Sequence, residues 1–237
     1  MMWLTWRRYR VRIILLSLYA FALVIFMIMT VHAFQTVDAN CSHHVITGPS
    51  GCGAAASRVG EHDSLITLGI VTMPLFLGLV LGVPLVASEI EAKTNRLAWS
   101  QGITRTRWLL TSWLTLALAS VAIMSLLETV VQWWANHVYG IVIAGRGTSI
   151  PTGLTGFTPV VIAVFALSFG ACLGAVLRST VLAVAGSFVG FLVILTAIST
   201  TETGPQGISQ LGVTGIYLIL VATCLGLTLM AVRRWRA

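Results

Sequence analysis

The chain has 237 residues, of which 57% are hydrophobic and only 9% are charged, and its mean hydropathy is +0.94. An average soluble protein carries roughly 25% charged residues. One compact core cannot hide so much apolar surface from water, so the composition excludes a soluble domain and indicates an integral membrane protein. The formal net charge is +7. The basic residues cluster at the ends of apolar runs, where they act as topology signals rather than as a nucleic-acid surface.

Six apolar runs are long enough to cross the hydrocarbon core of a bilayer, which takes about 20 helical residues. They are residues 13–34, 65–87, 109–131, 157–177, 181–200 and 211–232. The first run is longer than the apolar part of a signal peptide, so we expect an uncleaved helix. The segments between the runs are too short for a separate soluble domain. The predicted fold is therefore all-α, a single polytopic transmembrane domain over residues 1–237.

The distribution of Lys and Arg predicts the orientation in the membrane. Of the 14 basic residues, only Arg58 and Arg146 fall on one side of the predicted bilayer. The other side is therefore cytoplasmic and holds both termini, as expected for a multi-pass protein of the inner (plasma) membrane. The predicted outer loops are residues 35–64, 132–156 and 201–210. Trp133 and Trp134 are expected in the aromatic belt at the outer interface.

The sequence lacks the motifs of common catalytic sites. Its only lysine, Lys93, is not part of the Gly-Lys-Ser/Thr that ends a P-loop. ATP and Mg are therefore expected on a partner subunit, with no cofactor and no metal in this chain. No paired catalytic carboxylates occur within the predicted spans. We predict that the chain is not an enzyme.

Cys41 and Cys52 lie eleven residues apart in the first outer loop, with His43 and His44 between them. A disulfide that closes a short loop in an oxidising exterior is the favoured interpretation. Zinc binding and free thiols are the alternatives. Two further cysteines lie within the predicted spans and are expected to be small packing residues.

Small residues and prolines mark the predicted spans. Pairs of glycines four residues apart let helix backbones approach closely in lipid, either within one subunit or between two subunits. The three pairs are Gly78 and Gly82, Gly170 and Gly174, and Gly186 and Gly190. Pro74 and Pro84 should bend the second span, either as part of a moving element or as a static kink.

Glu128 is the one acidic residue inside a predicted span. Ser125, Glu128 and Gln132 share one face of the helix. A carboxylate in the membrane usually faces a bundle interior or a watery cavity, so these residues are predicted to line a substrate path. The alternative is that Glu128 reaches the outer interface, about one helical turn away.

Residues 88–102, between the second and third spans, are predicted to form a short amphipathic helix. Ser88 can cap its start, and Glu89 and Glu91 in the first turn favour the helix dipole. Glu89 and Lys93 are spaced for an ion pair, and Gly102 ends the helix. Such a helix lies along the membrane surface or docks into a groove of a partner.

This segment carries a resemblance to a known family. Glu89-x-Glu91 is followed by Thr-x-Arg-Leu-Ala-Trp-Ser-Gln at residues 94–101 and by Thr-Arg-Thr-Arg-Trp at residues 104–108. This pattern resembles the ABC-2 type permease subunits of actinobacterial ABC transporters. The resemblance implies that the helix couples the spans to an ATPase, through Glu89, Glu91, Lys93, Arg96 and Leu97.

The resemblance implies a permease that dimerises and works with two copies of an ABC ATP-binding subunit. The predicted function is export of a hydrophobic or amphipathic compound such as an antibiotic, with a role in drug or antibiotic resistance. The alternative is a non-transporting membrane scaffold or sensor that binds ligand through its outer loops. The lipid membrane and a second copy of the chain are the other expected partners, and nucleic acid is not.

Overall fold

The computed structural model describes residues 2–41, 65–66, 68–91, 105–142, 157–202 and 210–234. These residues are helical, apart from short connections, and include no strand. Leu68–Ala87 is named span 2 here. It contains a π-helical segment and the first part of a short helix that follows this segment. The elements are α1 (Met2–Cys41), η1 (Gly78–Gly82), α3 (Val83–Glu91), α5 (Arg105–Val142), α6 (Thr158–Leu177), α7 (Thr180–Glu202) and α8 (Gln210–Arg234).

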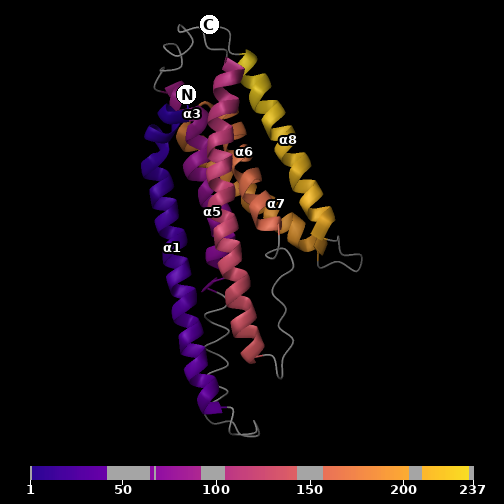
Figure 1. Ribbon diagram of the computed structural model, residues 1–237. Coiled ribbons are helices and arrows are strands. Elements are labelled where there is room, and N and C mark those ends of the chain that lie inside the picture. Colours follow the sequence, from indigo (N-terminus) through magenta and orange to yellow (C-terminus); the bar gives the residue numbers. More distant parts are fainter. Residues whose placement is uncertain are drawn as a thin grey trace.

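Five helices are long and apolar enough to cross a membrane, and they confirm five of the six predicted spans. They are Tyr9–His32, Leu68–Ala87, Thr106–Trp134, Thr158–Leu177 and Gly212–Val232. The fifth predicted span, residues 181–200, falls in α7. The apolar part of the described α7, Thr180–Ile194, is shorter than the five candidate spans. A sixth crossing stays a prediction. The beginning of α1 and the end of α8 lie at the same end of the bundle (Figure 1).

Some helices extend beyond the predicted spans. α1 continues to Cys41 and α5 to Val142, so residues 35–41 and 132–142 are helical where loops were expected. These extensions contain no proline, and a helix satisfies its own backbone hydrogen bonds in water as well as in lipid. Ser88 lies inside α3, so it does not cap a new helix as predicted, because the backbone runs through it without a break.

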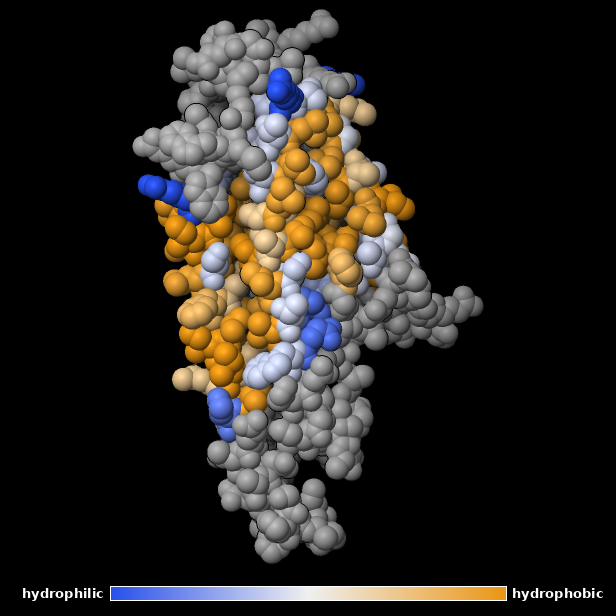
Figure 2. All heavy atoms as spheres, in the orientation of Figure 1, coloured by the Kyte–Doolittle hydropathy of each residue, from blue (hydrophilic) through white to orange (hydrophobic). Residues whose placement is uncertain are grey.

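Span 2 and α6 form the centre of the bundle. Buried residues make up 72% of the most apolar part of span 2 and 67% of that of α6, against 17% for α1 and 28% for α8. The outer helices expose large apolar side chains, such as Phe21, Leu126 and Ile219. Apolar residues accordingly dominate the middle of the face in Figure 2. This arrangement suits a bundle whose outer surface contacts lipid.

Two glycine pairs bring the backbones of span 2 and α6 into direct contact. A Cβ atom added to any of the four glycines would lie within 2.7 Å of an oxygen of the opposite backbone: Ala166 O for Gly78, Leu167 O for Gly82, Gly78 O for Gly170 and Val83 O for Gly174. Real Cβ atoms do not approach so closely. The interpretation of these two motifs as packing within one subunit is therefore confirmed.

The third glycine pair packs α7 on α6. A Cβ at Gly190 would lie 2.7 Å from the ring of Phe169, and one at Gly186 would lie 3.5 Å from Leu177. This pair therefore also packs within the chain. Because residues 186 and 190 lie beside residues 177 and 169, α7 runs antiparallel to α6.

Where the sequence predicted a bend in span 2, the structure has the π-helical segment η1. The N–H of Val83 donates to the carbonyl oxygen of Gly78, five residues earlier. Pro84 follows directly, and it has no N–H, while its ring would collide with the carbonyl four residues before it in a regular helix. Widening the helix by one residue per turn relieves this collision.

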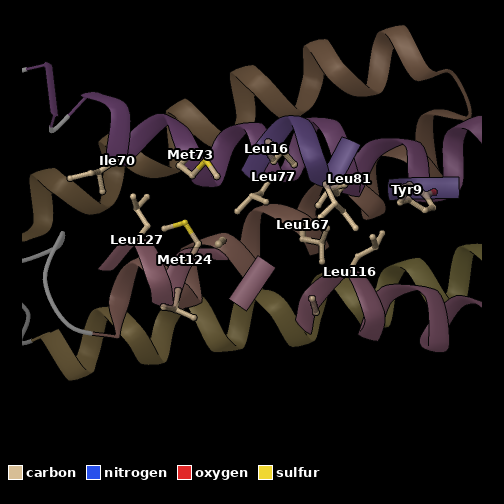
Figure 3. Packing of buried hydrophobic residues seen from close by; sticks show 14 of the residues in the cluster. Tyr9, Leu16, Ile70, Met73, Leu77, Leu81, Leu116, Met124, Leu127 and Leu167 are labelled. Atoms are coloured by element: carbon tan, nitrogen blue, oxygen red, sulfur yellow. The ribbon is translucent and has the colours of Figure 1, made fainter. Parts of the chain in front are cut away.

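A large apolar cluster fills the space between span 2 and the helices around it. Met73, Leu77 and Leu81 extend from span 2 toward α5, where Leu116 and Met124 meet them (Figure 3). All five side chains are almost fully buried. This cluster joins α1, span 2, α5 and α6 into one unit.

Two indole groups tie helices together inside the bundle. The Nε1–H of Trp134 on α5 donates to Thr30 Oγ1 on α1 over 3.0 Å, and that of Trp113 donates to Ser168 Oγ on α6 over 3.2 Å. Trp134 is 3% exposed. Trp134 therefore faces the protein rather than lipid, because its N–H finds an acceptor on α1, and its depth near the outer interface stays a prediction. Trp133, at 42% exposure, faces outward.

The close contact of span 2 with α6 predicts different effects of the same substitution at two glycines. Gly170→Ala would place a methyl group against the carbonyl of Gly78, so we expect a loss of about 1–3 kcal/mol in unfolding free energy. Gly226→Ala on α8, where nothing lies within 4 Å, is the matched control and should leave stability unchanged or slightly raised. Unfolding in mixed micelles measures both. Equal stability of the two variants would contradict the contact.

Candidate functional site

The predicted coupling residues lie at and beyond the end of α3. Glu89 and Glu91 belong to the last turns of this helix. Their side chains, together with Lys93, Arg96 and Leu97, lie outside the described part of the structure. The structure therefore places the entry to the predicted coupling segment but leaves its contacts as a prediction. α3 continues span 2 without a break, so a displacement of the segment would move span 2 directly.

The start of α3 is held from one side by α1. The hydroxyl of Tyr9 donates to the carbonyl oxygen of Pro84 over 3.4 Å, and Tyr9 is buried. The guanidinium carbon of Arg12 lies 5.3 Å from the centre of the Tyr9 ring, within the range of a cation–π interaction. The basic start of α1 is thereby connected to the half of span 2 that leads into the coupling segment.

On its other sides α3 meets α6 and α7. Val83 and Ala87 form a small buried cluster with Ala183 of α7. The turn between α6 and α7 is tight, since Arg178 adopts a left-handed conformation (φ 54°) and its N–H donates to Gly174 O. α3 is thus enclosed by α1, α6 and α7 at one end of the bundle.

The predicted substrate-path residues lie on one edge of α5. Gln132 Nε2 donates to Glu128 Oε1 over 3.1 Å, so the structure brings these two polar groups together within one helix. Glu128 and Ser125 are partly buried, and Gln132 is exposed. Met124 and Leu127, beside them, belong to the buried face of the helix. The polar face lies at the border between core and exposed surface, and a substrate path beside it stays a prediction.

Sequence reasoning missed the polar contacts between helices. Tyr19 on α1 contacts Thr72 on span 2, with 3.1 Å between the two hydroxyl oxygens, and Thr158 and Thr214 join α6 to α8 over 3.4 Å. A signal exists, because a buried Tyr or Trp must find a partner for its polar atom. However, the sequence contains many Ser and Thr hydroxyls, and only the packing of the helices shows which of them is the partner.

The structure tests the predictions for two of the four cysteines. Cys172 and Cys224 are buried free thiols, which confirms their interpretation as packing residues. Cys41 ends α1, but its side chain and Cys52 lie outside the described residues, so the disulfide stays a prediction. Within the described ranges, no group of three or more His, Cys, Asp or Glu residues is placed to hold a metal ion.

A family comparison decides the class of the protein. The profile of the family described as ABC-2 membrane transporter related matches residues 13–202, which is more than half of the chain. The chain belongs to this family. It is a multi-pass membrane protein of the ABC-2 permease type. No curated protein and no solved structure matches it. The matched region includes the resemblance at residues 88–108 and all of α3, α5 and α6.

Glu128→Gln tests the predicted substrate path, because it keeps the shape of the side chain and removes its charge. If the carboxylate contacts a cationic group of the substrate, transport and ligand-stimulated ATPase activity of the complex should fall about tenfold or more, which corresponds to one lost charge-assisted contact. Expression and assembly should not change. Unchanged activity would place Glu128 at the interface only, and failed assembly would give it a structural role.

The predicted Cys41–Cys52 disulfide is checked by mass spectrometry of protein that is alkylated without prior reduction. We expect a linked peptide pair, while Cys172 and Cys224 stay unlinked as an internal control. Alkylation of both Cys41 and Cys52 under these conditions would exclude the disulfide.

Proposed function

We propose that the chain is the transmembrane permease subunit of an ABC exporter. Two copies would work with two copies of a separate ABC ATP-binding subunit, which supplies ATP and Mg, to move a hydrophobic or amphipathic compound such as an antibiotic. Family membership supports the permease class. The observation that carries the coupling role is the direct backbone contact between span 2 and α6, beside the helix that leads into residues 88–102.

The contact between span 2 and α6 suits force transmission. Where side chains separate two helices, a small push is partly absorbed by rotamer changes. Here the carbonyls of Gly78 and Val83 lie against α6 itself, at Gly170 and Gly174. Closely packed groups transmit strain rather than absorb it. A movement of the coupling segment toward α6 would therefore displace α6 and the helices that pack on it.

The arrangement of basic residues supports the cytoplasmic orientation. Arg10 and Arg12 lie near the start of α1 and Arg107 lies in the first turn of α5, while Arg178 follows α6 and Arg234 ends α8. These helix ends lie together at one end of the bundle (Figure 1). Clustered basic residues mark the cytoplasmic side. Because α1 starts and α8 ends there, the chain crosses an even number of times, which favours α7 as the sixth crossing in the plasma membrane.

The resemblance at residues 88–108 supports the finer points of the proposal. It favours an actinobacterial origin, a homodimer and a role in antibiotic export. Substrates of this kind would reach the permease through the bilayer, because hydrophobic compounds partition into lipid.

Co-purification tests the proposal. The tagged full-length chain, extracted in mild detergent from its native host, should bring down a P-loop ATPase whose activity depends on the permease. Absence of such an ATPase would instead favour the membrane scaffold or sensor.

Glu89→Ala combined with Glu91→Ala should reduce the permease-dependent ATPase activity of this complex severalfold, since both carboxylates belong to the predicted coupling segment. Membrane insertion should persist, because a solvated charged face tolerates the loss of charge. Glu202→Ala, at the far end of α7, is the matched control and should leave the activity unchanged. Equal activity of all three proteins would exclude a coupling role for the pair.

A further inference from the structure

We propose that Cys172 on α6 and Cys224 on α8 form a binding site for a neutral compound of trivalent arsenic, which bonds to both sulfur atoms. The class includes arsenite and apolar organoarsenicals. Thr228, one turn after Cys224 on α8, completes the site as a hydrogen-bonding group. Binding at this site goes beyond the proposed function and does not depend on it.

The thiols of Cys172 and Cys224 lie against each other. They are hydrogen-bonded, and either sulfur can be the donor. The hydroxyl of Thr228 donates to Cys224 O over 2.7 Å and is also hydrogen-bonded to the thiol of Cys172. Two sulfur atoms and one hydroxyl oxygen from two different helices thus meet at one place.

The pairing of α6 with α8 explains why the thiols meet. The rings of Phe165 on α6 and Tyr217 on α8 lie in contact, with 5.4 Å between their centres. Cys172 and Cys224 each follow one of these rings by seven residues, which is two helical turns. The two helices therefore run parallel, and the cysteines occupy an equivalent layer of the same seam. Two long helices hold the sulfurs together, rather than a local turn of the chain.

The surroundings of the two sulfurs favour a ligand without charge. Both cysteines belong to a cluster of apolar and aromatic side chains from span 2, α6, α7 and α8. Cys172 and Cys224 are 7% and 8% exposed, so they lie nearer the border of this cluster than Phe165, which is 1% exposed. A charged complex is unfavourable in apolar surroundings. A ligand that arrives neutral and stays neutral is therefore favoured.

Trivalent arsenic meets this condition. Arsenite at neutral pH is the uncharged arsenious acid, which can exchange two of its three hydroxyl groups for the two sulfurs. Two As–O bonds break, two As–S bonds form, and the two thiol protons leave with the hydroxyl groups as two water molecules. Arsenic stays trivalent, so no electron is transferred, and every reactant and product is neutral. The hydroxyl group that remains on arsenic can form a hydrogen bond with Thr228.

The contact between the sulfurs matches the geometry of this product. Pyramidal arsenic bonds to both sulfurs on one side, so they can stay close together. Two-coordinate soft metal ions such as Ag(I) lie in line between two thiolates and would force the sulfurs apart, and they would leave a negative charge in the cluster. The pair lies near the end of α6 at which Arg178 follows. In the proposed orientation this end faces the cytoplasm, where reducing conditions keep thiols free.

Phenylarsine oxide tests the site in the full-length chain in mixed micelles, with Cys41→Ala and Cys52→Ala so that only the two buried thiols remain. It should protect both thiols from alkylation and add one phenylarsenic group, less two hydrogens, to the intact mass. An excess of a small dithiol should remove it, and a monothiol at the same concentration should not. Removal by the monothiol would indicate a single As–S bond and would overturn the site without the use of any further variant.

Variants test the need for both sulfurs. Cys172→Ser should raise the phenylarsine oxide concentration for half-protection about a hundredfold, because the second As–S bond forms within the complex. Cys224→Ser with Thr223→Cys is the matched control, since it keeps two thiols but moves one to an exposed position of α8. It should lose protection to the same extent. Protection as strong as in the parent protein, in either variant, would overturn the site.

Thr228→Val tests the third group with two probes. Protection by arsenite should weaken about fivefold, the effect of one lost hydrogen bond. Protection by phenylarsine oxide should not change, because this compound keeps no hydroxyl group on arsenic after it reacts. An equal loss for both probes, or no loss for either, would overturn the role of Thr228 as a hydrogen-bonding group for arsenite.

Discussion

The close approach of span 2 to α6 is the contact on which the rest of the bundle depends. In lipid there is little hydrophobic driving force between helices, so association relies on dense packing and on polar contacts. At Gly170 a Cβ atom would lie 2.5 Å from Gly78 O, so only a hydrogen fits between the two backbones. Four glycines on two helices make this approach possible, and the remaining helices pack around the pair.

The helices around this centre are joined to it by a few hydroxyl and indole groups. Trp134 connects α5 to α1, Trp113 connects α5 to α6, and Tyr9 connects α1 to the start of α3. Each bond removes a polar group from lipid and places it against a defined acceptor. The bundle thus combines a centre held by backbone contact with an outer layer held by single polar bonds, and α3 lies where the two meet.

Hydropathy predicted most of the spans because the thickness of the bilayer dictates their length. It did not predict the ends of α1 and α5, since the helical hydrogen bonds of residues 35–41 and 132–142 continue outside the apolar runs. It also did not indicate that the side chain of Trp134 faces the bundle and donates to Thr30. For Glu128 the spacing correctly indicated a face shared with Gln132, and the two groups do meet.

The sequence by itself determined the membrane class, five of the spans and the family, because apolar run length and a short motif between two spans are local properties of the chain. It also supplied the glycine pairs and Pro84. Only the tertiary structure decided that two of those pairs face each other, that Pro84 is accommodated by a π-helical segment, and that Ser187 lies buried without a partner among the described residues. Such features depend on which helix faces meet, and helix rotation and neighbour choice follow from packing across the whole bundle rather than from any one segment.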